Sequence, residues 1–153
     1  MESVSRSRFL DADPDVVESA LTDDVAAFVG AAGYDSVRVE EGRLELEQTL
    51  GLATLSLTLR EIDESDVTLA LQQEAGHFET MVTEYDVRPA DGGTQLWART
   101  EFTLGGVVGS VLDETVVSRQ RGREFEAQFD YVEGIASETD GSSGDGARAS
   151  DEG

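Results

Sequence analysis

The longest patterned part of the chain alternates apolar and polar residues. Between residues 53 and 60, alanine or leucine occupies every odd position and a polar residue every even position. A period of two buries one face of a strand and leaves the other in water, as in an antiparallel sheet. Turn-forming residues bound further segments of this kind. Strands are therefore expected at about residues 2–10, 34–40, 43–50, 53–62, 67–74, 80–88 and 94–104.

A helical period appears in two parts of the chain. After the first strand, Asp13 as a cap and Pro14 in the first turn predict a short helix. The residues TDD at 22–24 predict a second short helix that ends at Gly33. From about residue 106 to 135 the apolar residues again recur at helical spacing, which predicts one long helix. Its inner face is expected to carry Val111, Ser118, Gly122, Phe125, Phe129, Val132 and Ala136, with Thr115 just beside it.

Arginines are concentrated around a glycine in the middle of this long helix. Gly122 falls on the expected inner face, where a missing side chain would leave space between helix and sheet. Arg119 and Arg123 flank that face on one side, and Arg121 flanks it on the other. All of them can be edge residues whose stems cover the core. Alternatively, one of them closes a cavity and binds a polar or anionic group of a ligand.

The order of these elements is typical of the α+β class. Only the last helix is long enough to cover a curved sheet. The opening stretch RSRFLDADPDVVESALTDD and this order together resemble the START-like, or SRPBCC, superfamily of helix-grip domains. That superfamily includes birch pollen allergen-like proteins, polyketide cyclases and aromatases, and coenzyme Q-binding proteins. The residues that match its strand and helix entry are Ala12, Pro14, Val17, Leu21 and Asp23.

The resemblance covers residues 2–136 and implies a fold. It implies a curved antiparallel sheet of about seven strands around the C-terminal helix, with two short helices after the first strand. We therefore expect one domain at residues 1–136. Residues 137–153 are mostly Gly, Ser and acidic residues without a large apolar side chain, so they are expected to form a disordered tail.

The resemblance also implies a cavity between sheet and helix that binds or carries a small hydrophobic molecule, such as a lipid, an isoprenoid or a polyketide-like compound. Each candidate residue can equally be plain core. Tyr85 and Met81 are favoured, because a buried hydroxyl needs a partner and a methionine adapts to variable contents. The ligand-binding candidates are Leu57, Leu69, Leu71, Met81, Tyr85, Phe102, Val111, Thr115, Ser118 and Gly122, and the candidates for the cavity rim are Arg119 and Arg123.

Candidate catalytic and metal-binding residues are few. The single histidine, His77, has only Glu74 and Glu79 near it in sequence, which falls short of a catalytic zinc site. The glycines of LGGVVGS match neither a dinucleotide-binding nor a P-loop motif. If Tyr85 points inward, its acidic neighbours point outward, and no acid–base pair remains in the cavity. The sequence therefore predicts no cofactor, no metal and no intrinsic catalysis.

Two other functions stay open at this point. One is an enzyme of the polyketide cyclase or aromatase kind, in which Tyr85 would take part in turnover. The other is a protein-regulating module like the chaperone-activating relatives of this fold. Such a module would have a solid core without a cavity of ligand size. The sequence does not identify its protein partner.

Charge limits the partners of the protein. The formal net charge is -22, and all 11 basic residues are arginine. This composition resembles that of cytoplasmic proteins of salt-accumulating archaea, although an ordinary acidic protein is the alternative. Nucleic acid and anionic membranes would be repelled. With no cysteine, no apolar signal-like start and no apolar run of membrane-spanning length, the sequence predicts a soluble, cytoplasmic protein.

We expect molar salt to stabilise the folded state. At molar ionic strength the Debye length is about 3 Å, which screens the repulsion among the acidic side chains. Transfer from molar KCl to dilute buffer should therefore lower the melting temperature markedly, as followed by circular dichroism. An unchanged midpoint would contradict the adaptation to salt.

Overall fold

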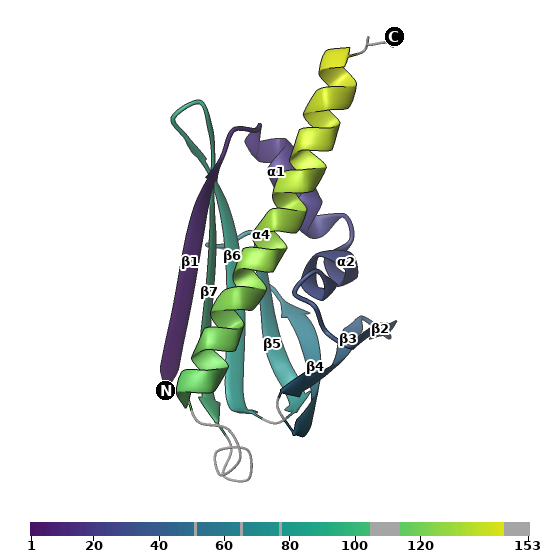
Figure 1. Ribbon diagram of the computed structural model, residues 1–153, viewed down its shortest axis with the longest axis vertical. Coiled ribbons are helices and arrows are strands. Elements are labelled where there is room, and N and C mark those ends of the chain that lie inside the picture. Colours follow the sequence, from purple (N-terminus) through teal and green to yellow (C-terminus); the bar gives the residue numbers. More distant parts are fainter. Residues whose placement is uncertain (51, 65, 77, 105–113, 146–153) are drawn as a thin grey trace.

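The computed structural model describes residues 1–50, 52–64, 66–76, 78–104 and 114–145 (Figure 1). Of the residues singled out above, His77, Val111 and the glycines of LGGVVGS lie outside the described residues. Their predicted roles stay predictions.

A seven-stranded sheet forms one layer of the molecule. Every neighbouring pair is antiparallel, and the order across the sheet is β1-β7-β6-β5-β4-β3-β2. The first strand thus lies beside the last one, and the remaining strands follow as a meander. This confirms the strands expected from the period of two, with shifts of a few residues at their ends. The strands are β1 (Glu2–Leu10), β2 (Ser36–Glu40), β3 (Arg43–Leu50), β4 (Ala53–Ile62), β5 (Leu69–Gly76), β6 (Phe78–Ala90) and β7 (Gly93–Leu104).

Irregular pairing helps to curve the sheet. The register shifts between Thr58 and Leu59 in β4, and again between Phe78 and Thr80 in β6. Such bulges bend a strand and increase its twist. At Gly76 the strands approach closely, because a Cβ atom there would lie 2.8 Å from a methyl carbon of Leu57. Only glycine fits this contact without displacing its neighbours.

Two short helices follow the first strand, as the sequence predicts. They are α1 (Pro14–Thr22) and α2 (Val25–Gly30). The Asp13 carboxylate accepts a hydrogen bond of 2.8 Å from the backbone N–H of Asp15, and the Asp24 carboxylate accepts one of 3.0 Å from that of Ala27. Both caps satisfy amides that a helix start leaves unpaired. The second helix ends at Gly30 rather than at Gly33, because residues 31–33 form a turn in which Gly33 has a φ of 100°.

The long helix α4 (Glu114–Asp145) lies diagonally across one face of the sheet (Figure 1). It contacts β1 and β7 of the sheet, and it also contacts α1 and α2. Because α1 contacts β6 and β7, it lies against the sheet beside α4. The predicted helix-grip architecture is therefore confirmed. The helix also continues beyond residue 136, where the sequence analysis placed the end of the domain and the start of a disordered tail. Ala136 is its last buried residue among those whose side chains are described, and residues 146–153 lie outside the described part.

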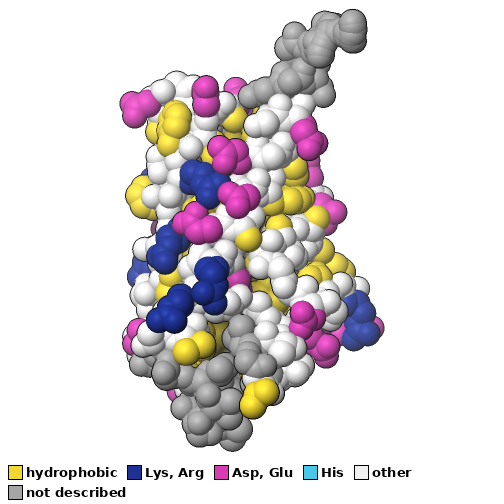
Figure 2. All heavy atoms as spheres, viewed as in Figure 1, with side chains coloured by type: hydrophobic (Ala, Val, Ile, Leu, Met, Phe, Trp, Pro, Cys, Tyr) yellow, Lys and Arg dark blue, Asp and Glu magenta, His cyan; other side chains and the backbone are white. Residues whose placement is uncertain are grey.

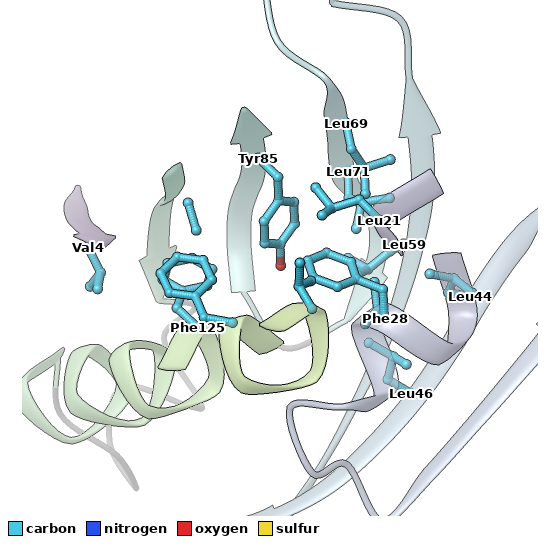
Figure 3. Packing of buried hydrophobic residues seen from close by; sticks show 14 of the residues in the cluster. Val4, Leu21, Phe28, Leu44, Leu46, Leu59, Leu69, Leu71, Tyr85 and Phe125 are labelled. Atoms are coloured by element: carbon cyan, nitrogen blue, oxygen red, sulfur yellow. The ribbon is translucent and has the colours of Figure 1, made fainter. Parts of the chain in front are cut away.

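The core is filled where α2 and α4 meet the sheet. Tyr85 of β6 points toward α4 and lies between two phenylalanine rings (Figure 3). Its ring centre is 4.7 Å from that of Phe28 on α2 and 5.9 Å from that of Phe125 on α4, both at edge-to-face angles. These rings pack α2 and the long helix against the same strand.

The middle of α4 is bound to β1 through Arg8. Its Nη1 donates to the carboxylates of Asp130 and Glu133 at 2.8 and 3.0 Å, and its Nη2 donates to Glu126 at 2.8 Å. The guanidinium also lies 5.5 Å from the centre of the Phe129 ring. Figure 2 shows arginine and acidic side chains gathered on the face where β1 lies beside α4.

We predict that Arg8→Gln lowers the free energy of unfolding by roughly 1 kcal/mol, since a network of ion pairs exceeds one exposed pair. Arg99→Gln is the matched control, because its side chain is 56% exposed and pairs with Glu101 of its own strand. Urea unfolding of both variants at the same high KCl concentration measures the difference. Equal losses would show that the Arg8 network does not help to hold α4.

Candidate functional site

A small cavity lies between the concave face of the sheet and the N-terminal half of α4. About 20 Å³ of it is open to the centre of a water-sized molecule. That is room for roughly one water molecule, far below the ~300 Å³ of the smaller ligand pockets. Side chains of the described residues therefore almost fill the space that the resemblance assigned to a ligand.

The wall of the cavity has an apolar side and a polar side. The apolar side comes from the strands and from one residue of α4, and consists of Leu46, Leu55, Leu57, Phe78, Met81 and Val117. The polar side comes from the segment after α2, from β3 and from α4, and consists of Tyr34, Gln48, Gln120, Arg121 and Glu124. Such a wall suits a molecule that is apolar over most of its surface and polar at one end.

An ion pair is buried on the polar side. The side chains of Arg121 and Glu124, three residues apart on α4, are 7% and 2% exposed. The Nη1 atom of Arg121 donates to Glu124 Oε1, and its Nη2 atom donates to the hydroxyl of Thr83 at 2.9 Å. The guanidinium carbon lies 5.0 Å from the centre of the Phe125 ring. The charged groups are thus neutralised by each other inside the core.

Tyr34 and Gln120 complete the surroundings of the carboxylate. The hydroxyl of Tyr34 donates to Glu124 Oε1 at 3.3 Å and accepts from Arg121 Nη1 at 3.4 Å. Gln120 donates from Nε2 to the other carboxylate oxygen at 3.4 Å. One donor of the cluster remains: Arg121 Nε is the one buried side-chain N or O atom without a hydrogen-bond partner in the described part of the chain.

Two threonines of the sheet fix the position of the guanidinium. Thr83 accepts from Arg121 because a guanidinium can only donate. The hydroxyl of Thr83 lies 2.9 Å from that of Thr100, and either can be the donor of that hydrogen bond. The hydroxyl of Thr100 also lies 3.2 Å from the carbonyl oxygen of Val82. Arg121 is thus linked to two neighbouring strands of the sheet.

A second polar connection crosses the core beside the first. Tyr85 donates its hydroxyl proton to Gln128 Oε1 at 2.8 Å, and Gln128 Nε2 donates to the backbone carbonyl of Val29 at 3.2 Å. The sequence predicts that Tyr85 points inward and that its hydroxyl has a hydrogen-bond partner. The structure confirms that Tyr85 is buried and shows that the partner is Gln128 of α4.

Burial determines the protonation of these groups. It raises the pKa of Tyr85 to about 12, although the positive charge of Arg121 opposes the shift. It also raises the pKa of Tyr34 well above the ordinary value, with a further contribution from the charge of Glu124. Burial by itself lowers the pKa of Arg121, but the Glu124 carboxylate and the two tyrosines raise it above its usual value. At neutral pH the site therefore offers protonated hydroxyls and a charged guanidinium.

The predicted strand residues are all buried, but they divide into two groups. Leu57 and Met81 line the cavity. Leu69, Leu71, Tyr85 and Phe102 lie in the core and are not part of the lining. Most of the predicted strand residues thus pack the protein, as the alternative interpretation of the sequence held.

The predicted helix residues that the structure describes lie outside the lining of the cavity. Thr115, Ser118 and Arg119 border a surface groove beside β1, and Arg123 is exposed and donates to Gln120. Gly122 faces β1 as well, where a Cβ atom would come within 2.5 Å of the Arg6 guanidinium. The space at Gly122 is therefore taken by Arg6, and Arg119 and Arg123 lie away from the described cavity.

The physical reason is that the helix buries two neighbouring stripes. The predicted residues Phe125, Phe129, Val132 and Ala136 are buried, as expected, and so are Val117, Arg121, Glu124 and Gln128, which have the same helical spacing but are mostly polar. A polar stripe is expected to face water, so the pattern of apolar residues does not predict that it is buried. Arginine and glutamate can occupy it because they neutralise each other. The spacing of Arg121, Glu124 and Gln128 was the available signal for the missed residues.

Other kinds of site have little support in the described residues. Among them, no group of three or more His, Cys, Asp and Glu side chains is arranged to hold a metal ion. No described helix is long and apolar enough to cross a lipid bilayer.

Comparisons with known proteins show the fold. No protein-family model matches the sequence, and no curated protein sequence matches it. Among solved structures, TTHA0849 from Thermus thermophilus is 15% identical with a TM-score of 0.72, and the match covers 90% of this chain and 99% of that one. The Zhui aromatase/cyclase from Streptomyces sp. R1128 is 20% identical with a TM-score of 0.68, over 97% and 96% of the two chains. A START superfamily protein from Mycobacterium smegmatis is 13% identical with a TM-score of 0.62, over 90% and 98%. The chain therefore has the helix-grip fold of START-like proteins.

We predict that Tyr34 and Tyr85 stay protonated in the folded protein above the pH at which an unfolded tyrosine ionises, about 10. Because their folded pKa values are raised, their contribution to stability is complete below about pH 10 and is lost as the pH rises further. Ultraviolet titration of wild type, Tyr34→Phe and Tyr85→Phe, with circular dichroism in parallel, measures this. Ionisation of all three tyrosines near pH 10 in a fully folded protein would contradict it.

We predict that Gly122→Ala is neutral or stabilising by up to about 1 kcal/mol, the usual helix preference for alanine over glycine. The new Cβ displaces only the far end of Arg6, whose side chain is 45% exposed. Gly134→Ala is the control, since a Cβ there meets nothing within 4 Å and so reports the helix preference alone. Urea unfolding compares the two. A clear destabilisation at Gly122 alone would show that the space at this glycine is required.

Proposed function

We propose that this protein binds and carries a small, mostly apolar molecule between the sheet and α4. The observation that carries the proposal is the buried Arg121–Glu124 pair at the wall of an apolar cavity. Burying two charges costs solvation free energy, and apolar residues of similar volume often stabilise a core as well or better. A domain that needed only a packed interior would gain little from this pair. A polar group of a bound molecule gives the pair a use.

Binding requires the cavity to enlarge. The ion pairs of Arg8 hold α4 at residues 126–133, whereas the cavity-lining residues of the helix lie at 117–124. The helix before Arg121 can therefore move relative to the sheet, while Arg121 stays bound to Thr83 and the rest of the helix stays attached. Met81 adds adaptability, because its unbranched side chain changes shape easily. The proposed ligand site is thus an expandable one.

The charge of the chain supports a location in a salt-rich cytoplasm. A net charge of -22 with no lysine is suited to a solvent that screens acidic side chains. The same charge argues against an anionic partner, and so favours a neutral small molecule over nucleic acid. The identity of the molecule is to be found by experiment.

The test is native mass spectrometry of protein purified at high salt, followed by organic extraction of the bound material. We expect a reproducible apolar compound in the wild type. Val117→Phe should abolish its retention because the new ring fills the cavity, and Thr115→Phe should retain it because that side chain is exposed and outside the lining. Loss in both variants, or no compound in the wild type, would contradict the proposal.

One observation favours a second function, a protein-regulating module. The cavity of about 20 Å³ is smaller than a ligand needs, which fits a domain that acts through its surface. In that case the wild type would purify without a small molecule at high salt, and a defined protein partner would be recovered with it. Val117→Phe would then leave the partner interaction unchanged.

A further inference from the structure

We infer that the molecule bound in this cavity presents a neutral hydrogen-bond acceptor, such as a ketone, quinone or ester oxygen, to Nε of Arg121. The inference rests on the proposed function, because it describes how the proposed site selects its ligand. It concerns the polar end of the ligand alone. The rest of the ligand would face the leucines, Phe78 and Met81 of the opposite wall.

Three of the five N–H groups of Arg121 donate to described residues. Its Nη1 atom binds Glu124 and Tyr34, and its Nη2 atom binds Thr83, so Nε is the one nitrogen of the guanidinium without a partner among the described residues. The Nε atom is also buried. Leaving a buried donor unpaired costs free energy, so an acceptor at this position is favoured. Arg121 belongs to the wall of the cavity, so an oxygen atom of a ligand that enlarges this cavity would satisfy Nε if it reached it there.

The position of this donor is fixed before a ligand arrives. Thr83 accepts from Nη2 of Arg121 at 2.9 Å and holds that side of the guanidinium. Glu124 holds the guanidinium at the other nitrogen, and the ring of Phe125 lies against it. A preorganised donor binds its acceptor without a further loss of side-chain entropy. The Nε–H group is therefore built to recognise one oxygen atom.

Charge balance makes a neutral acceptor the better ligand. Arg121 is the only cationic residue in the described lining and Glu124 the only anionic one, so their charges cancel. A carboxylate ligand would lose its hydration and would be repelled by the carboxylate of Glu124. Its only gain would be a hydrogen bond from Nε of Arg121, so it should bind more weakly. A pure hydrocarbon would leave Nε unpaired. The site should therefore prefer a neutral carbonyl compound over both.

The experiment compares probes of similar shape. We would measure binding of 2-acetylnaphthalene, 2-isopropylnaphthalene and 2-naphthoate to the full chain in molar KCl by calorimetry. The ketone should bind at least about tenfold more tightly than the hydrocarbon, a ratio in line with one well-placed hydrogen bond in a dry site. The naphthoate should bind more weakly than the ketone. In parallel, nuclear magnetic resonance of isotope-labelled arginine should show one Nε–H resonance that shifts with the ketone and does not shift with the hydrocarbon.

A double variant tests the assignment to Arg121. Arg121→Met with Glu124→Gln removes the donor without leaving a buried, unpaired carboxylate. It should bind the ketone and the hydrocarbon equally well. Arg119→Met is the matched control, because that arginine is exposed on the same helix and outside the lining, and it should keep the ketone preference. The resonance data on the wild type decide the question even if the double variant does not fold.

The outcomes separate this inference from the proposed function. Equal binding of the ketone and the hydrocarbon to the wild type, or an Nε–H resonance that the ketone leaves unchanged, would overturn the inference and leave a carrier in place. Tighter binding of the naphthoate would overturn the choice of a neutral ligand. A ketone preference that survives in the double variant would exclude Arg121 as its source. Binding of none of the probes would overturn both proposals.

Discussion

The interior of this protein depends on one constraint, namely that two opposite charges on the same helix must be neutralised and hydrogen-bonded inside an apolar core. The Arg121–Glu124 pair meets this constraint only if α4 turns these residues toward the sheet. Tyr34 must then reach the carboxylate, and Thr83 must accept from the guanidinium. The burial of this polar stripe of the helix and the positions of Tyr34 and Thr83 beside it follow from the same requirement.

The long helix makes different contacts along its length. Around its middle, Arg8 of β1 binds a row of acidic residues on the surface, and these ion pairs attach the helix to the sheet. Toward its N-terminal end, the residues that face the sheet are mostly polar and border a cavity. One element thus provides both a fixed support and a chemically distinct surface. In a fold shared at 20% identity or less with the solved structures it was compared with, such local chemistry is what sets a function.

The charge of the surface and the neutrality of the interior are separate properties. The net charge of -22 is a property of the whole chain and concerns its interaction with the solvent. Inside, the described lining of the cavity holds one cation and one anion, and they cancel. A strongly acidic protein can therefore have an interior cavity whose described wall carries no net charge. The small size of the cavity means that binding of a ligand would accompany a movement of the first turns of α4.

The sequence by itself determined the elements and their order. Strand alternation and the caps Asp13 and Asp24 depend on neighbours in the chain, and so they can be read locally. The candidate site was predicted only in part, with Leu57 and Met81 in the lining. The spacing of Arg121, Glu124 and Gln128 places these residues on one face of the helix, but the sequence does not show that this face is buried. Only the tertiary structure decided which arginine is buried, because its partners Thr83 and Tyr34 lie 38 and 87 residues away in the chain and meet it through the packing of helix on sheet.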